Sequence, residues 1–354
     1  MKHEVTKGRG ATLQIEGRFE NVAREGVDDG WGTADEELPP FKTTVTVDSA
    51  KSVIQRNDSP DLPFSLSLNA YRGCEHGCIY CYARPSHAYL NLSPGLDFET
   101  RLFAKPEAAK LLRAELAKPS YQCSPIALGS NTDPYQPIER EWKITRQILE
   151  VLAEHRHPVS IVTKSALVER DLDVLTQLAS DDLVQVFVSV TTLDAELARN
   201  MEPRAASPRR RLQAIQTLNE AGVPCGVMAA PVIPFLTDAE LEHVLQAAHQ
   251  HGARSAGYTL LRLPYELKDL FKDWLAIHCP LKAEHVMNRM REMRGGREND
   301  PEFGSRFRGN GLFADLLAQR FRMACERMGF NLEGRTLATG LFKPSSRNGQ
   351  MDLF

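Results

Sequence analysis

Three of the seven cysteines in this chain of 354 residues crowd into the segment YRGCEHGCIYCYAR, residues 71–84. Cys74, Cys78 and Cys81 lie between glycines and tyrosines. Thiolates are soft ligands that suit zinc or an iron–sulfur cluster. The spacing therefore predicts a metal centre on this loop.

Two kinds of metal centre fit three close thiols. Structural zinc takes four ligands, and the nearby His76 and His87 are candidates for the fourth. The chain has no second CxxC pair and no HxxxH pattern, which would be commoner zinc signatures. Three cysteines would instead leave one iron of a [4Fe–4S] cluster open, and an open iron can bind a small molecule and make it react.

The cysteine loop follows the first of six short apolar segments that are predicted as buried strands, since they are rich in β-branched or small residues. The segments are residues 64–71, 125–130, 158–164, 184–190, 225–232 and 255–261. Predicted helices lie between them, at residues 106–117, 142–155, 168–179, 207–221 and 238–251. Strand-then-helix units of this kind predict an α/β fold with a parallel sheet, forming a partial (β/α)6 barrel.

Polar residues come directly after the apolar segments, which is where such folds place their chemistry. They are Arg72 to Cys74, SNTDPYQP (130–137), Thr163, Lys164, Ser189, Thr191, Thr192, PVIPFLTD (231–238) and Arg262. Because the carboxyl ends of parallel strands share one rim, these side chains are expected to converge.

The pattern changes towards both ends of the chain. Residues 1–60 are acidic and rich in turn residues, so an extended or partly disordered arm is expected before a barrel at 61–264. Three further helical stretches predict a helical C-terminal extension over 265–345. Residues 346–354 are expected to form a flexible tail.

Composition narrows the function classes. The sequence is 42% hydrophobic, with a mean hydropathy of −0.34 and a net charge of −3. That charge argues against a strong general field for nucleic acid. No apolar run is long enough to span a bilayer and no secretory signal is visible, so a cytoplasmic protein without membrane attachment is expected.

The C-x3-C-x2-C spacing, with Tyr80 just before the last cysteine, resembles the radical S-adenosylmethionine (SAM) superfamily. The resemblance implies a partial (β/α)6 barrel, and a [4Fe–4S] cluster held by Cys74, Cys78 and Cys81. It also implies that SAM binds the open iron and is cleaved to a 5′-deoxyadenosyl radical. A reducing partner such as flavodoxin or ferredoxin is implied as well.

A longer series of motifs, over residues 65–240, resembles the spore photoproduct lyase group of DNA-repair enzymes and its bacterial relatives. The motifs are RGCEHGCIYCYAR, SNTDPYQPIE, IVTK, FVSV, MEPR and VMAAPV. The resemblance implies that the chain is a radical SAM enzyme of lyase-like type.

The same resemblance implies roles for individual residues of this chain. By position it assigns SAM contacts to Thr132, Lys164 and Ser189. It assigns an apolar contact with adenine to Ile233. Radical transfer is assigned to two tyrosines, Tyr80 and Tyr82.

One position departs from the lyase pattern. The lyase has a cysteine two residues before its second-strand SAM contact, and that thiol returns hydrogen to the substrate radical. Ser130 stands there in this chain, and a hydroxyl is a poor hydrogen donor. Cys123 lies before the strand, at its far end. The departure predicts another chemistry, or a tyrosine that returns the hydrogen.

Other polar residues have a structural and a functional interpretation. TDPYQPIE (132–139) could hydrogen-bond substrate or ribose, or simply form a turn before a helix. Arg204 could reach SAM or a phosphate. Arg209 to Arg211 are expected to form a solvated helix face.

The chain ends in GQMDLF, which resembles the short peptide by which bacterial repair and replication proteins dock on the sliding clamp. Docking would use Met351, Leu353 and Phe354 as apolar anchors, and Gln350 would form a polar contact. Asp352 lies between Met351 and Leu353 in this peptide. The sliding clamp is therefore an expected partner.

The expected function is a radical SAM enzyme acting on nucleic acid, in a reaction resembling DNA repair. Radical SAM modification of RNA, protein or a small metabolite stays open. So does a zinc-stabilised module that binds nucleic acid without catalysis.

Overall fold

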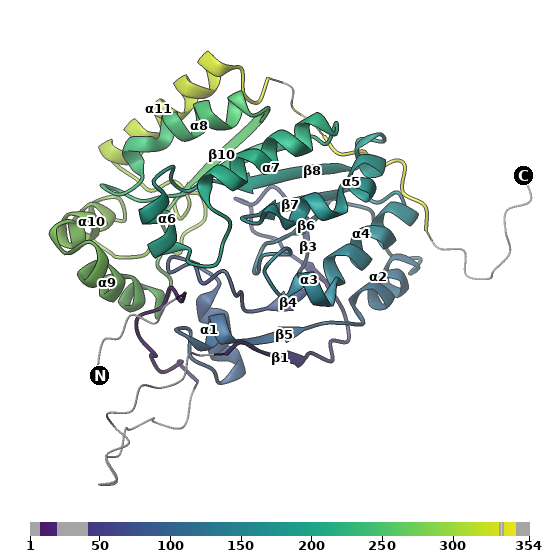
Figure 1. The fold of residues 1–354 in the computed structure, drawn as a ribbon, viewed down its shortest axis with the longest axis horizontal. Helices are drawn as coiled ribbons and strands as arrows, with labels where there is room; N and C mark the ends of the chain where they lie inside the picture. The colour runs from purple at the N-terminus through teal and green to yellow at the C-terminus, as the bar shows by residue number, and fades with distance from the viewer. Residues whose placement is uncertain (1–7, 20–41, 333, 335, 345–354) are drawn as a thin grey trace, which may run out of the picture.

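The computed structural model describes residues 8–19, 42–332, 334 and 336–344. Its centre is a seven-stranded sheet in the order β10-β9-β8-β7-β6-β3-β2 (Figure 1). Six strands of this sheet are parallel: β3 (Leu66–Leu68), β6 (Ile126–Leu128), β7 (Val159–Thr163), β8 (Val184–Ser189), β9 (Cys225–Val232) and β10 (Ser255–Leu260). At one edge β2 (Ile54–Arg56) pairs antiparallel with β3. The predicted α/β fold with six parallel strands is confirmed.

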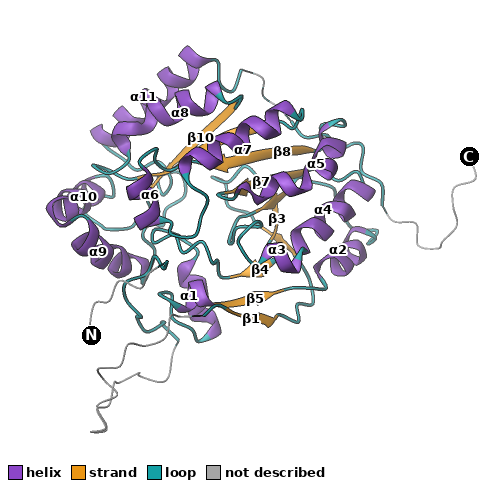
Figure 2. Ribbon diagram, viewed as in Figure 1, coloured by secondary structure: helices purple, strands orange, loops and turns teal. Residues whose placement is uncertain are grey.

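Five helices follow one another along the outside of this sheet (Figure 2). They are α2 (Ala108–Leu116), α4 (Ile144–Glu154), α5 (Leu172–Ala179), α7 (Pro208–Glu220) and α8 (Leu241–Gln250). Each lies within its predicted range. Short helices precede some of them: α3 (Glu139–Trp142), η3 (Ala166–Asp171), α6 (Ala195–Met201) and η4 (Asp238–Glu240).

The sequence suggests Ser207 as the cap of α7, and Thr237 or Asp238 as the cap of α8. The Ser207 hydroxyl does accept from the N–H of Arg210 at 3.4 Å, and Pro208 occupies the first helical position. For α8 the prediction was wrong. Thr237 accepts from the N–H of Ile233 at 2.8 Å and closes the turn after β9, Asp238 begins η4, and α8 begins only at Leu241.

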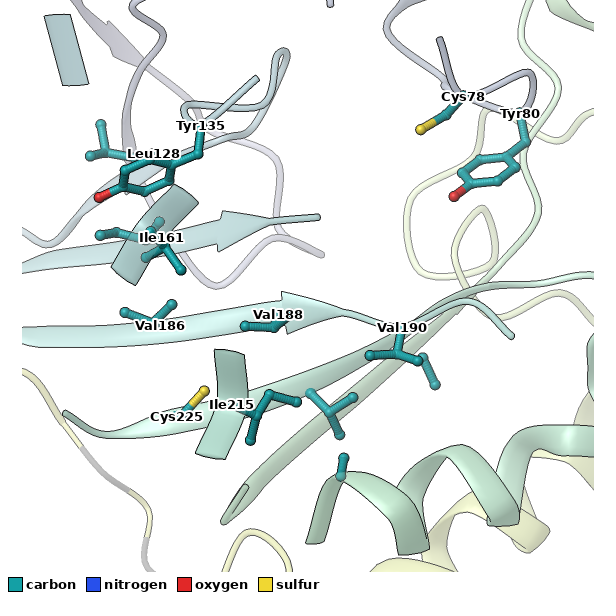
Figure 3. Packing of buried hydrophobic residues seen from close by; sticks show 14 of the residues in the cluster. Cys78, Tyr80, Leu128, Tyr135, Ile161, Val186, Val188, Val190, Ile215 and Cys225 are labelled. Atoms are coloured by element: carbon teal, nitrogen blue, oxygen red, sulfur yellow. The ribbon is translucent and has the colours of Figure 1, made fainter. Parts of the chain in front are cut away.

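Branched aliphatic residues fill the inner face of the sheet. Ile161, Val186 and Val188 are fully buried, and Figure 3 shows them between two ends of the core. Cys78 and Tyr80 lie at one end, near Val190, while Cys225 lies at the other. The cysteine loop is therefore at the carboxyl end of the strands, as the sequence predicted.

A second, three-stranded sheet of order β1-β5-β4 lies beside the barrel and supports the cysteine loop. It consists of β1 (Thr44–Val47), β5 (Arg101–Ala104) and β4 (Tyr71–Arg72), with η2 (Arg84–Leu90) and α1 (Asp97–Thr100) in the same region. The sequence did not predict it, because strands of two to four residues are too short to show a periodic pattern. Cys74 lies two residues after the end of β4.

The helical C-terminal extension is confirmed. It contains α9 (Leu267–His278), α10 (Pro280–Glu292) and α11 (Leu312–Met328); α9 packs on α10, and α11 packs on α8. Figure 1 shows α9 and α10 beside one edge of the barrel. None of the helices in the described ranges is both long and apolar enough to cross a bilayer.

Residues 336–344 run along the barrel to His157, where Phe342 packs against the imidazole ring at 5.4 Å. His157 Nδ1 donates to the carbonyl of Pro158 at 3.0 Å, so Nε2 accepts from the Tyr121 hydroxyl at 2.6 Å. Burial lowers the pKa of His157 to about 4. The folded protein therefore holds this imidazole neutral.

This neutral imidazole makes stability depend on pH. Between about pH 6.5 and pH 4 the unfolded chain binds a proton at His157 that the folded protein does not, so stability falls as the pH decreases. We expect His157→Gln to remove up to about 1.4 kcal/mol per pH unit of this slope. Unfolding midpoints measured at pH 7.5 and 5.5 test it: the variant should show the smaller difference, and equal differences would contradict the prediction.

Candidate metal and cofactor site

The cysteine loop is a series of tight turns. Cys74 N–H donates to the carbonyl of Phe98 at 3.0 Å, and Cys81 N–H donates to that of Cys78 at 3.2 Å. Gly77 has a φ of +69°, and a Cβ there would lie 2.7 Å from a carboxylate oxygen of Glu99. Glycine is therefore required at this turn for both conformation and space.

A fully buried arginine, Arg84, binds the loop from inside. Its guanidinium donates to the carbonyls of Cys78 (2.9 Å) and Gly77 (3.0 Å), and to that of Gly95 (2.9 Å). It also pairs with Glu99, likewise fully buried, at 2.5 Å. One side chain thus fixes the main chain at two successive turns of the cysteine loop.

Glu99 fastens the N-terminal segment onto the same loop. Its carboxylate accepts from the N–H groups of Gly10 (3.0 Å) and Ala11 (2.8 Å). A Cβ on Gly10 would lie 1.8 Å from the carbonyl oxygen of Gly77, so only glycine permits this approach. Part of the expected N-terminal arm is therefore packed against the cysteine loop.

The segment after β6 supports the loop from another side. Thr132, which is buried, donates its hydroxyl to the carbonyl of Gly73 at 2.6 Å. Gln136 donates to the same carbonyl at 3.2 Å and accepts from the N–H of Glu75 at 2.8 Å. Two residues of the TDPYQPIE motif therefore position the backbone that carries Cys74.

Asp133 joins three strand ends. It accepts from the Thr163 hydroxyl and from the N–H of Lys164, both at 2.7 Å, and lies 3.3 Å from His76 Nδ1. Burial raises the pKa of Asp133, but the neighbouring His76 and the hydrogen bonds outweigh burial and hold it at about 2. Asp133 is therefore a permanent carboxylate that ties β7 to the cysteine loop.

Tyr80 belongs to a buried network at the end of β8. Its hydroxyl donates to the carboxylate of Glu202, which also accepts from Thr191 at 2.7 Å and pairs with Arg211. Arg211 is 1% exposed and donates to the carbonyl of Ser189 at 3.1 Å. The predicted solvated face at Arg209 to Arg211 is wrong for Arg211.

Lys164, at the end of β7, has an ammonium group without a carboxylate partner among the described residues. Its Nζ lies 5.7 Å from the centre of the Tyr80 ring. Burial raises the pKa of the Cys78 thiol, and Lys164 is the strongest influence that opposes this rise. The geometry therefore places a free cation next to the cysteine loop.

Tyr82 and Ser130 lie together at the mouth of the site. The Tyr82 hydroxyl donates to the main-chain carbonyl of Ser130, and the tyrosine is 49% exposed. The Ser130 hydroxyl accepts from the amide of Asn69 at 3.1 Å. Tyr82 is therefore half exposed, although burial raises the pKa of its hydrogen-bonded hydroxyl to about 12, whereas Tyr80 is buried.

The remaining predicted contacts are more enclosed. Ser189 is buried at the last position of β8. Ile233 is fully buried after β9, so its contact with adenine stays a prediction. Arg204, at the end of the MEPR motif, pairs with Glu75 at 2.9 Å and thereby also contacts the cysteine loop.

The two histidines considered as a fourth zinc ligand have other partners. His76 Nδ1 faces the carboxylate of Asp133 at 3.3 Å, and His87 Nε2 donates to the carbonyl of Arg101 at 2.9 Å.

Several residues of this site had no recognised sequence signal. Arg84 and Glu99 lie in segments without clear periodicity. For Arg211 a signal existed, because it shares a helix face with Ile215 and Leu218, both fully buried.

Comparison of the sequence with protein families gives a match to the radical SAM superfamily over residues 68–248. A Mycobacterium tuberculosis protein, described as uncharacterized, is 41% identical over 235 residues, covering 66% of this chain and 68% of its own. A Methanocaldococcus jannaschii protein, also described as uncharacterized, is 32% identical over 173 residues, covering 49% of this chain and 62% of its own.

Among solved structures, the spore photoproduct lyase complexed with dinucleoside spore photoproduct has a similar fold. The TM-score is 0.58 at 14% sequence identity, covering 81% of this chain and 80% of that one. A variant of the same lyase with bound AdoMet and the dinucleoside gives the same TM-score, identity and coverage. At this identity the likeness shows a common fold.

Proposed function

This chain belongs to the radical SAM superfamily, and on that premise we propose that it is a lyase-like enzyme that cleaves SAM reductively and acts on nucleic acid. The bound cluster and SAM would supply a 5′-deoxyadenosyl radical that abstracts hydrogen from the substrate. The observation that carries the proposal is Lys164, a cation with no acidic partner in the described part of the chain, beside the three-cysteine loop.

In this proposal Cys74, Cys78 and Cys81 ligate the iron atoms. SAM contacts come from Thr132, Lys164 and Ser189, at the carboxyl ends of the neighbouring strands β6, β7 and β8. Lys164 pairs with the SAM carboxylate, because a free ammonium there meets a complementary charge. Thr132 also positions the backbone of the cofactor pocket, because its hydroxyl donates to the Gly73 carbonyl.

We assign the two tyrosines different tasks. Tyr80, enclosed by Glu202 and Thr191, positions the loop. Tyr82 would give the hydrogen atom of its phenolic O–H to the substrate radical, and the resulting tyrosyl radical would regain an electron from the reducing partner and a proton from solvent. The support for this assignment is that Tyr82 is half exposed and bonded to Ser130, the residue that stands in place of the lyase cysteine. A nucleic-acid substrate is supported by the shared fold with the lyase, whose solved structures contain a dinucleoside.

The proposed reaction is tested by purifying the protein without oxygen, reconstituting it with iron and sulfide, reducing it, and adding SAM. Mass spectrometry should detect 5′-deoxyadenosine. No deoxyadenosine, together with one zinc per chain in the purified protein, would overturn the proposal in favour of a non-catalytic zinc module.

Lys164→Met is expected to weaken SAM binding by about tenfold, since a charge-assisted contact contributes about 1.4 kcal/mol or more. Methionine keeps a flexible apolar chain but removes the charge. Equilibrium binding of SAM to the reconstituted protein measures the effect. Lys118→Met, an exposed lysine on the outer surface, should bind SAM like the original chain. Equal affinities for all three proteins would contradict the assignment.

The proposed clamp peptide, residues 350–354, lies outside the described residues. We keep it as a proposed link to replicating or repaired DNA. Deleting these five residues is expected to abolish capture of the protein by immobilised bacterial sliding clamp. Undiminished capture would contradict the prediction.

A further inference from the structure

Arg262 lies at the open side of the barrel, directly after β10. Its position is fixed on both sides, because Leu261 N–H donates to the carbonyl of Val232 at 3.1 Å and Leu260 N–H donates to that of Phe307 at 2.8 Å. The guanidinium stacks over the Phe307 ring at 4.7 Å. The backbone and the ring together hold the Arg262 side chain in one direction.

This arginine makes no direct ion pair within the part of the chain that the structure describes, and its buried Nε has no hydrogen-bond partner there. The nearest acids are engaged elsewhere: Asp61 accepts from Arg306 at 2.7 and 2.5 Å, and Asp300 accepts from the Ser305 hydroxyl at 2.6 Å. Burial lowers the pKa of Arg262, as does the neighbouring Arg306.

Burying a cation beside another cation raises the free energy of the folded protein. Binding an anion from outside the chain would offset this increase. Most other arginines near this rim do have partners in the described chain. Arg294 donates to the carbonyls of Ser305 and Leu261, and Arg291 pairs with Glu298. Among these arginines of the described chain, Arg262 therefore stands out by having no partner.

The location of Arg262 connects it with the proposed active site. Arg262 lies at the carboxyl end of the parallel strands, the rim of the barrel at which the cysteine loop with Tyr82 also lies. Loops from the two edges of the seven-stranded sheet contact each other here, since Arg306, in the loop bonded to β10, pairs with Asp61, in the loop between β2 and β3. An anion bound to Arg262 would lie at this opening. The parts of the ligand attached to that anion would then lie beside Tyr82.

We propose that Arg262 binds a backbone phosphate of a nucleic-acid substrate and thereby sets which nucleotide lies beside Tyr82. This inference rests on the proposed function. A phosphodiester is favoured over a peptide carboxylate because aromatic rings accompany the charge. Phe303 is exposed, and Phe303 and Phe307 both flank Arg306 at 4.7 and 4.8 Å, an arrangement suited to base stacking.

The test measures binding of a fluorescent single-stranded decathymidylate to the reconstituted protein with SAM, by anisotropy at several salt concentrations. Arg262→Gln is expected to weaken binding about tenfold, as for loss of one charge-assisted contact. The slope of log K against log salt should fall by about 0.7, the value for one phosphate on a single strand. Arg262→Lys keeps the charge, so its slope should match the original protein.

The matched control is Arg209→Gln, which removes from the outer helix α7 one exposed arginine that forms no ion pair with the residues the structure describes. Its affinity and salt slope should equal those of the original protein. Equal binding by Arg262→Gln and Arg209→Gln would overturn the inference. So would binding of an acidic peptide that depends on Arg262 while the oligonucleotide does not bind.

Deoxyadenosine formation by the original protein is assayed in parallel. If deoxyadenosine forms but Arg262→Gln binds the oligonucleotide like the original protein, only the proposed phosphate site is wrong. If no deoxyadenosine forms, the proposed function fails, whatever the binding shows. Unfolding midpoints of the two Arg262 variants must match that of the original protein, and Arg262→Lys supplies the comparison if Arg262→Gln is less stable.

Discussion

Replacing Cys78 with alanine is expected to abolish deoxyadenosine formation and to lower the iron content after reconstitution to background. Two thiolates would remain for a cluster that the loop holds with three. Cys78 is buried in a turn whose carbonyl is bound by Arg84, so the smaller alanine fits without disturbing the main chain. The loss should therefore affect the metal centre far more than the fold.

Cys225→Ala is the matched control for this experiment. Cys225 is also a buried cysteine, but it lies at the start of β9, at the opposite end of the core (Figure 3). We expect full iron content and normal deoxyadenosine formation from this variant. If both variants keep their activity, or both lose it, the assignment of Cys78 as an iron ligand is contradicted.

Arg84→Met is expected to destabilise the protein by about 3–5 kcal/mol, because removing one partner of a buried ion pair leaves the other charge uncompensated. Glu99 would be left as an unpaired buried carboxylate, and the carbonyls of Gly77 and Cys78 would lose their hydrogen-bond donor as well. The cysteine loop should then lose its shape. We expect a lower unfolding midpoint together with poor iron incorporation.

Arg113→Met provides the comparison, since Arg113 pairs with Glu154 on the surface, where the side chains are 48% and 56% exposed. Exposed pairs contribute about 0–1 kcal/mol, so this variant should resemble the original protein. Adding Glu99→Gln to Arg84→Met removes the stranded charge and should restore part of the midpoint. Similar midpoints for Arg84→Met and Arg113→Met would show that Arg84 has no such role.

The place of the cysteine loop could be predicted from the sequence because its signals are local. The thiols Cys74, Cys78 and Cys81 lie on one loop, and their spacing is set by a few turns. The parallel strands were predicted because continuous β-branched segments occur where strands are buried. From strand order alone, Lys164 was expected at the rim that carries the cysteines.

The supporting residues were not accessible in this way. Glu99 and Gly10 are far apart in the sequence, and nothing local indicates that they hold the same loop. Arg211 was interpreted as solvated because it follows two other arginines. Its partner, Glu202, comes from a separate segment that only the folded chain brings beside α7.

The sequence by itself determined the parallel strands of the barrel and the cysteine loop, since periodicity and short-range spacing encode them, while the class of cofactor follows from membership of the radical SAM superfamily. Only the tertiary structure decided which charges are paired: Arg84 is neutralised by Glu99, whereas Arg262 and Lys164 have no acidic partner among the described residues. The physical reason is that pairing depends on distances between segments remote in sequence, and a side chain's type does not reveal its partner.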